Sequence, residues 1–506
     1  MESSLKEELD AFFKPESIVL VGFSRSVGAI STNVLINIKS SGYEGDVFVC
    51  NRNVAAGERI FGVENYPKVG LIPKKVDLAI LTVPPHVLIE AIEECAAAGV
   101  RAAICITSGF GETGDEGRKR QEELVRVARR GGLRIIGPNC NGLFSAEAKL
   151  AAMLAPVRPT PGSVGVVTQG GTPGVMMVNL SKKYAPIVGF SKCVNLGDTA
   201  DVQPHEILEY YGEDPSIKVI ACYFEGLRDG RKFVEIAARI TPKKPIIFYK
   251  AGTSEAGKQA ASSHVGALAG DERVYEAALK QAGVLQVSNI NDLVDATAAL
   301  VTQPLPKGRN VGILTFGGGG GVMATDELER LGLKVPQISK ELVETFNEML
   351  PPYWSHRNPV DMTDGFADLR VPPKCAELLL KEDYIDMLLV IGVGVLEGVD
   401  VGENLPPELK KVGEKLKALT IGFESHVGKA LLGLRERYKK PIIGCMICGE
   451  RDGSSIKAFQ KSGVPVYDSP DRAARALWAL WTYKQFVDRH KNQSGTRNLR
   501  TTRHGK

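Results

Sequence analysis

The chain has 506 residues, of which 43% are hydrophobic and 24% are charged, and its formal net charge is +4. It is too long for a single hydrophobic core, so two to four domains are expected. The small positive excess argues against a nucleic-acid-binding protein, and no run approaches the roughly 18 apolar residues of a membrane span.

Along the first part of the chain, apolar runs alternate with amphipathic helical patterns. The runs at 17–23, 46–51, 76–83, 102–108 and 133–140 are predicted to be strands. Apolar strands that alternate with helices are typical of a doubly wound parallel sheet covered on both faces. An α/β domain is therefore predicted for residues 8–150.

The same alternation starts again twice. A proline-rich break at 155–162 precedes the second run, and "TQPLPKGR" precedes the third. The sequence thus predicts three consecutive α/β domains, at 8–150, 156–302 and 308–485. Residues 486–506 are polar and basic without a hydrophobic period, and we expect them to be disordered.

Each domain opens with a strand, a small-residue turn and a helix, which is an arrangement suited to anions. The first turn, "GFSRSVG", contains Gly22, Ser24, Arg25 and Gly28 but not the full GxGxxG. This incomplete fingerprint weakens a nicotinamide-dependent oxidoreductase as an interpretation. Ser24 and Arg25 suit a nucleotide phosphate, and the alternative is a plain solvent-exposed turn.

The second and third domains open with richer glycine turns. These are "TQGGTPGVMM" at 168–177 and "TFGGGGGVMATDELERLGL" at 315–333. Consecutive glycines are costly to order, so close approach of an anion to bare N–H groups is the favoured interpretation. A flexible linker is the alternative, but a linker is rarely followed at once by a strong helix pattern.

His264 lies in the small-residue stretch "SSHVGALAGDERVYEA", which we expect to form a loop. A neutral imidazole nitrogen can carry a phosphoryl group covalently, provided that donors hold the phosphate oxygens. Glu225, at the end of a predicted strand, is the candidate carboxylate that fixes the imidazole tautomer. The alternative for His264 is a solvated surface residue.

Nine cysteines lie mostly within apolar runs, as expected for reduced thiols in a cytoplasmic protein. Cys445 and Cys448 have a CxxC spacing, but a zinc site needs about four ligands and no second pair is present. A buried strand is therefore the favoured interpretation. The N-terminal "MESSLKEELDAFF" is acidic and lacks the build of a signal peptide.

Six segments together resemble the nucleoside-diphosphate-forming acyl-CoA synthetases, relatives of succinyl-CoA synthetase. The most specific, "AASSHVGALAGDERVYEAALKQAGVLQV", is similar to the phosphohistidine loop of that family and the helix after it. The others, in order, are "GPNCNG", "NLGDTADV", "FEGLRDGRKF", "NPVDMTD" and "PVYDSPDRAARAL". The resemblance covers about residues 8–485 and is closest to α subunits of the ADP-forming acetate–CoA ligase type.

The resemblance implies a Rossmann-like CoA-binding domain followed by two flavodoxin-like domains, with His264 and Glu225 as catalytic residues. The implied CoA-binding residues are Gly22, Ser24, Arg25, Val83, Pro84, Ser108, Gly109 and Asn139. The implied phosphate-binding residues are Gly170, Gly171, Thr172, Gly318, Gly319 and Gly320. No metal ligand is expected within this chain.

The implied activity is that of an acid–thiol ligase, which interconverts acyl-CoA, ADP and phosphate with a carboxylic acid, CoA and ATP. Phosphate attacks the thioester, His264 takes the phosphoryl group from the acyl phosphate, and ADP receives it with Mg²⁺. No segment resembles an ATP-grasp domain. The resemblance therefore implies that ADP/ATP and Mg²⁺ bind a separate ATP-grasp β subunit in an α2β2 complex, with no nucleic-acid or membrane partner.

Two positions depart from the family pattern. Gly170 replaces a usual serine, which removes a hydroxyl donor, and Asp198 replaces an asparagine, which adds negative charge near an anion site. The alternative function is accordingly a non-catalytic CoA-binding or regulatory protein of the same fold. A pure binding module would have no need for His264. Acetate, branched-chain and aryl acids are all compatible with the sequence, as is another nucleoside diphosphate.

Overall fold

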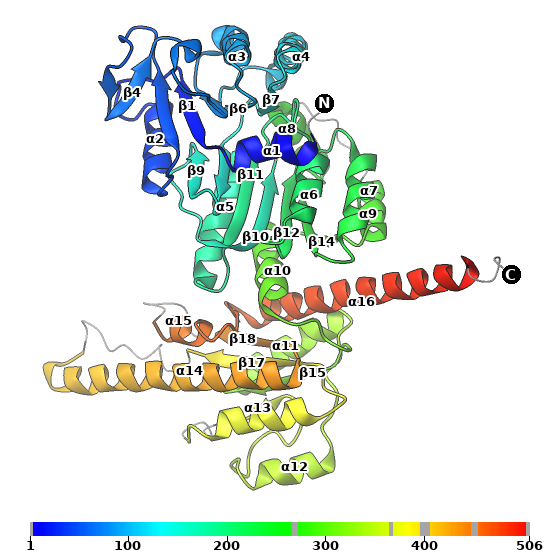
Figure 1. Cartoon of the computed structure of the whole chain (residues 1–506). Helices are drawn as coiled ribbons and strands as arrows, with labels where there is room; N and C mark the ends of the chain where they lie inside the picture. The colour runs from blue at the N-terminus through cyan, green and yellow to red at the C-terminus, as the bar shows by residue number, and fades with distance from the viewer. Residues whose placement is uncertain (1–3, 266–271, 364–367, 395–404, 447–453, 502–506) are drawn as a thin grey trace. The chain divides into compact units, whose positions relative to one another are not determined.

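The computed structural model describes residues 4–265, 272–363, 368–394, 405–446 and 454–501, without the side chains of 261–265, 272, 454–455 and 493–501. Three sheets rich in parallel strands follow one another along the chain (Figure 1). They fall into two compact units. The first unit comprises Met1–Leu180 and Gly189–Leu293, and the second comprises Ser181–Val188 and Val294–Lys506.

The first sheet has the strand order β3-β4-β2-β1-β5-β6-β7. Its parallel strands are β1 (Ser17–Val21), β2 (Asp46–Cys50), β4 (Val63–Tyr66), β5 (Leu78–Leu81), β6 (Ala102–Cys105) and β7 (Arg134–Ile136). The short β3 (Arg59–Ile60) pairs with β4 antiparallel at the edge. The order reverses at β1, which gives the doubly wound, Rossmann-like arrangement that the sequence predicts.

Both faces of the first sheet are covered by helices. Because successive residues of a strand point to opposite faces, they enter different hydrophobic clusters. Ile18 and Leu20 of β1 belong to a cluster with α1 (Leu5–Phe13) and α2 (Ile30–Ser40). Val19 and Val21 belong to another cluster, with α3 (Leu88–Ala97) and α4 (Asp115–Arg130). This two-sided burial explains the uninterrupted apolar runs in the sequence.

The second sheet has the order β14-β13-β12-β10-β11-β8-β9. Its strands are β8 (Gly142–Ser145), β9 (Leu150–Met153), β10 (Pro161–Thr168), β11 (Phe190–Asn195), β12 (Val219–Phe224), β13 (Ile246–Lys250) and β14 (Leu285–Val287). The run β11-β10-β12-β13-β14 is parallel and has the flavodoxin-like order, whereas β8 and β9 are antiparallel. β8 pairs with β11 and β9 pairs with β8, so residues 142–145 and 150–153 lie in the second sheet, whereas the predicted first domain extends to residue 150.

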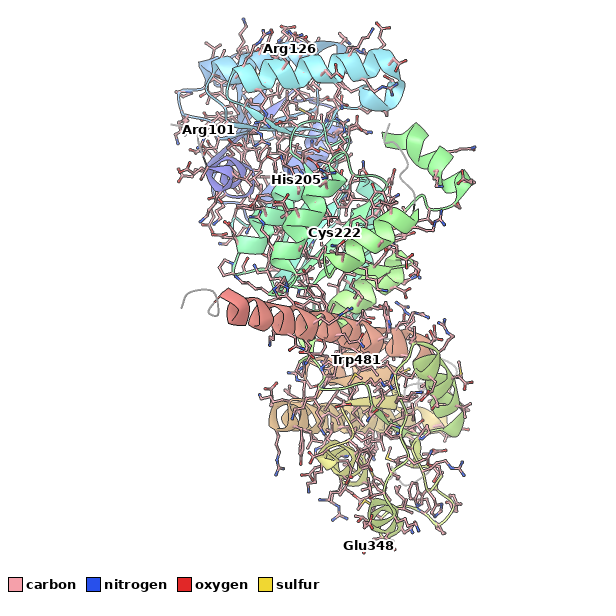
Figure 2. All side chains as sticks on the ribbon, turned by 90° about the vertical axis from the view of Figure 1, so that its right-hand side faces the viewer. Arg101, Arg126, His205, Cys222, Glu348 and Trp481 are labelled. Carbon is pink, nitrogen blue, oxygen red and sulfur yellow. The ribbon has the colours of Figure 1, made fainter. Side chains whose placement is uncertain are left out.

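The first and second sheets share one hydrophobic cluster, which explains why they form one compact unit. Phe13 of α1 stacks on Tyr210 of α6 (Pro204–Glu213), with ring centroids 5.4 Å apart. Cys222, in β12, is buried in the same cluster (Figure 2). The remaining helices of this part are α5 (Gly171–Ser181), α7 (Gly230–Ile240), α8 (Glu255–Val265), α9 (Glu272–Gln281) and α10 (Ile290–Thr302).

The third sheet lies in the second unit and has its own hydrophobic cluster. Its order is β16-β15-β17-β18-β19, all parallel, from β15 (Val311–Thr315), β16 (Val360–Asp361), β17 (Met387–Val393), β18 (Ile442–Met446) and β19 (Val466–Tyr467). Its helices are α11 (Gly318–Arg330), α12 (Lys340–Asn347), α13 (Val371–Lys381), α14 (Lys410–Tyr438), α15 (Ser454–Gln460) and α16 (Pro470–Thr501). The order is again flavodoxin-like.

The C-terminal segment differs from the expectation of disorder. Helix α16 continues through residues 486–501, and only 502–506 lie outside the described residues. The segment contains no proline and several arginine, lysine and glutamine residues, which have a high helix propensity. A lack of hydrophobic period therefore did not prevent the last helix from continuing.

The described helices include none with the length and apolar character required to cross a lipid bilayer. Every described cysteine that is unpaired is buried, including Cys445 in β18, as predicted. Cys448 lies outside the described residues. No cluster of three or more His, Cys, Asp or Glu side chains suited to a metal ion occurs in the part of the chain that the structure describes.

Candidate functional site

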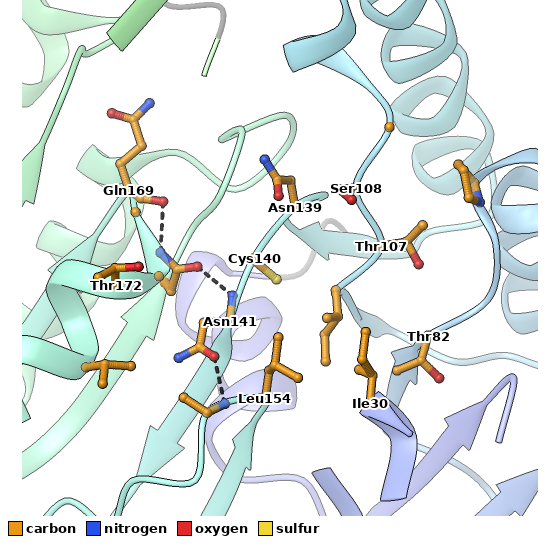
Figure 3. Close-up of a pocket in the computed structure, with 18 of the residues that line it drawn as sticks. Ile30, Thr82, Thr107, Ser108, Asn139, Cys140, Asn141, Leu154, Gln169 and Thr172 are labelled. Atoms are coloured by element: carbon orange, nitrogen blue, oxygen red, sulfur yellow. Dashed lines mark hydrogen bonds between the residues drawn. The ribbon is translucent and has the colours of Figure 1, made fainter. Parts of the chain in front are cut away.

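A cavity of about 810 Å³ lies within the first unit, among the segments that follow β5, β6, β7 and β9 and the start of α5 (Figure 3). It brings together most of the predicted CoA-binding and phosphate-binding residues of this unit. The predicted residues that line it are Val83, Pro84, Ser108, Gly109, Asn139, Gly170, Gly171 and Thr172. Segments almost 90 residues apart in the sequence thus form one cavity wall.

The lining of this cavity carries no carboxylate, amine, guanidinium or imidazole group among its described residues. Its polar groups are amides and hydroxyls, and its apolar side chains include Ile30, Leu154 and Val175. Cys140 also lines it, and burial raises the pKa of that thiol to about 12, so it is a neutral group near pH 7. Any charge that develops in the cavity must be stabilised by hydrogen-bond donors.

Two amide side chains, those of Asn195 and Asn141, connect the walls of the cavity (Figure 3). Asn195, at the end of β11, donates from Nδ2 to the Gln169 carbonyl at 2.8 Å and accepts from the Asn141 N–H at 2.6 Å. Asn141 in turn accepts from the Ala155 N–H at 2.9 Å. Sequence reasoning missed this network, although Asn141 and Asn195 lie within two of the recognised motifs.

Glu225 lies beside the first turn of α5. Gln169 accepts at Oε1 from the N–H groups of Glu225 (2.9 Å) and Gly226 (3.0 Å), which fixes the chain at the end of β12. A Cβ atom added to Gly170 would lie 3.4 Å from Glu225 Oε1 and 3.1 Å from Pro173 Cδ. The glycine at 170 therefore relieves a tight contact next to the carboxylate.

Gln169 provides a first test of this geometry. Gln169→Leu is expected to destabilise the first unit by about 1–3 kcal/mol, because two buried N–H groups lose their acceptor. Urea unfolding followed by circular dichroism measures the change, with Gln169→Glu as the control that keeps an acceptor oxygen. A Leu variant as stable as the parent would show that Gln169 does not hold the Glu225 segment.

The predicted residues of the turn between β1 and α2 do not line the cavity, although Ile30, at the start of α2, does. Gly22 has φ +80°, and an added Cβ would lie 2.6 Å from Val83 Cγ1, so packing alone requires glycine there. The Ser24 N–H donates to Ser31 Oγ at 3.0 Å, and Arg25 forms an exposed ion pair with Glu58. No side chain caps the start of α2. A ligand at the turn would therefore not compete with a capping side chain for the first N–H groups of the helix.

His264 lies in the last turn of α8 and not in the loop that the sequence led us to expect. The preceding alanine, glutamine and lysine residues favour a helix, which explains the difference. The side chain of His264 and residues 266–271 lie outside the described part. Its predicted role is therefore considered below as a proposal.

The glycines at the start of α11 have two different surroundings. A Cβ on Gly318 would lie 2.9 Å from Asp361 Oδ2, and one on Gly320 would lie 2.9 Å from Ile391 Cγ2. An added Cβ on Gly319 would meet nothing within 4 Å. Packing thus accounts for two of the three predicted phosphate-binding glycines, while Gly319 leaves open space in the first turn.

Three family models match consecutive parts of the chain. A CoA binding domain matches residues 16–146, a succinyl-CoA ligase like flavodoxin domain matches 161–300, and a ligase-CoA domain matches 311–391. The matched ranges follow the order of the three sheets.

Relatives extend over almost the whole chain. The α subunit of ADP-forming acetate–CoA ligase II from Pyrococcus furiosus is 36% identical, with 96% of this chain and 99% of that protein covered. ADP-forming acetate–CoA ligase I from Archaeoglobus fulgidus is 34% identical and covers 94% of this chain, which spans 64% of that longer protein. Acetyl-coenzyme A synthetase 1 from Ca. Korarchaeum cryptofilum, solved with phosphate and ADP, has a TM-score of 0.81 at 32% identity, with 95% and 97% coverage.

Proposed function

This chain belongs to the family of ADP-forming acetate–CoA ligase α subunits, and we propose that it is the CoA-binding, phosphohistidine-carrying subunit of an ADP-forming acyl-CoA synthetase. The observation that carries the proposal is the single cavity in which the CoA-binding candidates meet the glycine-led start of α5. Nothing among the described residues favours the non-catalytic alternative.

CoA is suited to the two parts of the first unit in different ways. The pantetheine arm is an uncharged chain with two amide groups, and it matches a cavity lined by amides, hydroxyls and apolar side chains. The phosphates would bind at the uncapped start of α2, where Ser24 and Arg25 lie. The exposed pair between Arg25 and Glu58 is weak enough for a phosphate to displace the carboxylate.

The thiol end of CoA would lie near Asn139, close to the start of α5. There, inorganic phosphate held by the N–H groups of Gly170, Gly171 and Thr172 attacks the thioester carbonyl. A carbon–oxygen bond forms, the carbon–sulfur bond breaks, and CoA leaves as the acyl phosphate is produced. Since the described residues that line the cavity include no cation, N–H dipoles and the helix terminus would stabilise the charge.

His264 then acts as the phosphoryl carrier. Its ring nitrogen forms a bond to phosphorus as the acyl oxygen–phosphorus bond breaks, which releases the carboxylic acid, and the phosphoryl group later passes to ADP. Glu225 is proposed to accept from the other ring nitrogen and to fix the tautomer. Its position beside α5, held through Gln169, supports this role. Gly318, Gly319 and Gly320 would supply N–H donors at the start of α11.

The nucleotide site is proposed to lie on a separate ATP-grasp β subunit, in a complex of two α and two β chains. The relative named as an α subunit matches over almost its full length, whereas the relative named without a subunit is longer than the matched part. Mg²⁺ would shield the nucleotide charge on that partner. The buried, unpaired thiols fit a reducing cytoplasm.

The proposal predicts that the full chain binds CoA and depends on a partner for turnover. Calorimetric titration should show CoA binding that Arg25→Ala weakens about tenfold, since one charge-assisted contact is lost. Arg101→Ala, at another exposed arginine that pairs with a carboxylate, is the matched control.

With acyl-CoA, phosphate and ADP, ATP should form only after an ATP-grasp subunit from the same genome is added. ATP made by this chain alone would contradict the separate nucleotide site, and absence of binding at millimolar CoA would contradict the proposal itself.

A further inference from the structure

We propose that Asp198 and Glu112 share one proton, and that this carboxyl pair positions the two loops that form the CoA-facing wall of the cavity. Loss of that proton is then expected to weaken CoA binding. The inference rests on the proposed function, because CoA is the ligand whose binding reports the position of the loops.

Asp198 follows β11 and is almost completely enclosed, with 1% of its surface exposed. Its Oδ1 atom accepts from Asn139 Nδ2 at 3.3 Å, which links it to a residue that lines the cavity. Its Oδ2 atom is buried and, among the described residues, has no donor. A buried, ionised carboxylate oxygen without a donor is unfavourable in free energy, so the protonated form of Asp198 is the more stable one.

Glu112 supplies the acceptor for such a proton. It lies in the short turn Gly111–Thr113 and accepts from the N–H groups of Gly109 and Phe110, the latter at 2.9 Å. The Glu112 side chain is also within hydrogen-bonding range of the Asp198 carboxyl group. In this contact Asp198 is therefore the donor and Glu112 the acceptor.

The charges around the pair agree with this assignment. Burial, and then the negative charge of Glu112, raise the pKa of Asp198 to about 7, while the hydrogen bond from Asn139 and the positive charge of Arg228 act in the opposite direction. Cys140, which also lies close to Asp198, has its pKa raised to about 12 by burial and is neutral over the same range. Asp198 therefore keeps its proton up to about neutral pH.

The pair connects two walls of the cavity. On one side, Glu112 holds the N–H of Gly109, next to Ser108, and on the other side Asp198 holds Asn139 in a left-handed conformation with φ +58°. Two adjacent carboxylates repel each other, so ionisation of both would separate these segments. We call the arrangement in which Asp198 contacts Glu112 the closed wall. The pKa of Asp198 in the folded protein is raised above its ordinary value. The contact therefore stabilises the closed wall at low pH, and this stabilisation is lost as the pH rises to about 7.

Isothermal titration of CoA into the full chain tests the pair. For the parent protein we expect CoA to bind about tenfold more weakly at about pH 8 than at about pH 6, because Asp198 loses its proton over this range. Above about pH 8 the affinity should not change further. Asp198→Asn keeps both contacts, since its amide donates to Glu112 and its oxygen accepts from Asn139. It should therefore remove this pH dependence. Glu112→Gln should only reduce it, because burial is the larger cause of the raised pKa of Asp198. Because the phosphates of CoA titrate equally in every experiment, the comparison between variants cancels their contribution.

Glu116→Gln, at an exposed carboxylate in the first turn of α4, is the matched control and should behave as the parent does. If Asp198→Asn and the parent have the same pH profile, the shared proton does not position the cavity wall and the inference is wrong. If the parent binds no CoA at any pH, the proposed function fails instead, so the two failures are distinguishable. Circular dichroism of each variant at both pH values verifies folding.

Discussion

Replacing His264 with alanine is expected to abolish ATP formation by the complete two-subunit enzyme, with a loss of at least about a thousandfold. The imidazole nitrogen is the proposed covalent carrier, and alanine leaves no nucleophile at this position. Incubation of the parent complex with labelled ATP and Mg²⁺, or with acyl-CoA and labelled phosphate, should label this chain. The His264→Ala chain should remain unlabelled.

The stability of the label distinguishes the residue that carries it. A phosphoramidate on histidine is labile in acid and stable in base, whereas phosphoserine behaves in the opposite way, which matters because Ser262 and Ser263 precede His264. Ser263→Ala is the matched control and should retain the label. CoA affinity should be nearly unchanged in His264→Ala, since the proposed CoA contacts lie elsewhere in the unit. ATP formation at the parent rate by the His264→Ala complex would exclude the phosphohistidine mechanism.

The sheets could be predicted from the sequence because both of their faces are buried. In β1, the residues Ile18 to Val21 enter two different clusters alternately, so every position must be apolar and the strand is visible as a continuous run. The antiparallel β8 and β9 were not separated from the first domain. They are short: β9 pairs with β8, and β8 pairs with β11, in which Lys192, the partner of Ser145, lies 47 residues further along the chain.

The candidate site was predictable only in part. Motifs identified Asn139 and Gly170, but the hydrogen bonds that join Gln169, Asn195 and Asn141 depend on loops that meet only after folding. The glycine turns were interpreted from the sequence as an anion site, a plain turn or a flexible linker, but not as the result of close packing. Gly22 and Gly318 show that close packing against Val83 and Asp361 is an independent reason for glycine.

Asp201 illustrates a motif residue whose contacts concern stability. It belongs to the segment "NLGDTADV", and its side chain is fully buried. It accepts from Arg129 Nε at 2.6 Å, from Arg134 Nε at 3.1 Å and from the Ile135 N–H at 2.7 Å. Arg134 is itself buried and also pairs with Glu8 of α1 and Glu206 of α6. The carboxylate is therefore at the centre of a buried ionic network that joins both sheets of the first unit.

Asp201→Ala is expected to destabilise the first unit by about 3 kcal/mol, because a buried arginine loses one carboxylate and a buried N–H loses its acceptor. The three tryptophans, Trp354, Trp478 and Trp481, all lie in the second unit, so their fluorescence follows that unit alone. Urea unfolding by circular dichroism should show the loss, while the tryptophan transition should stay at the parent midpoint. Asp46→Ala, which breaks an exposed pair with Lys74, should cost less than about 1 kcal/mol. An Asp201→Ala loss no larger than that of Asp46→Ala would show that the network contributes little net stability.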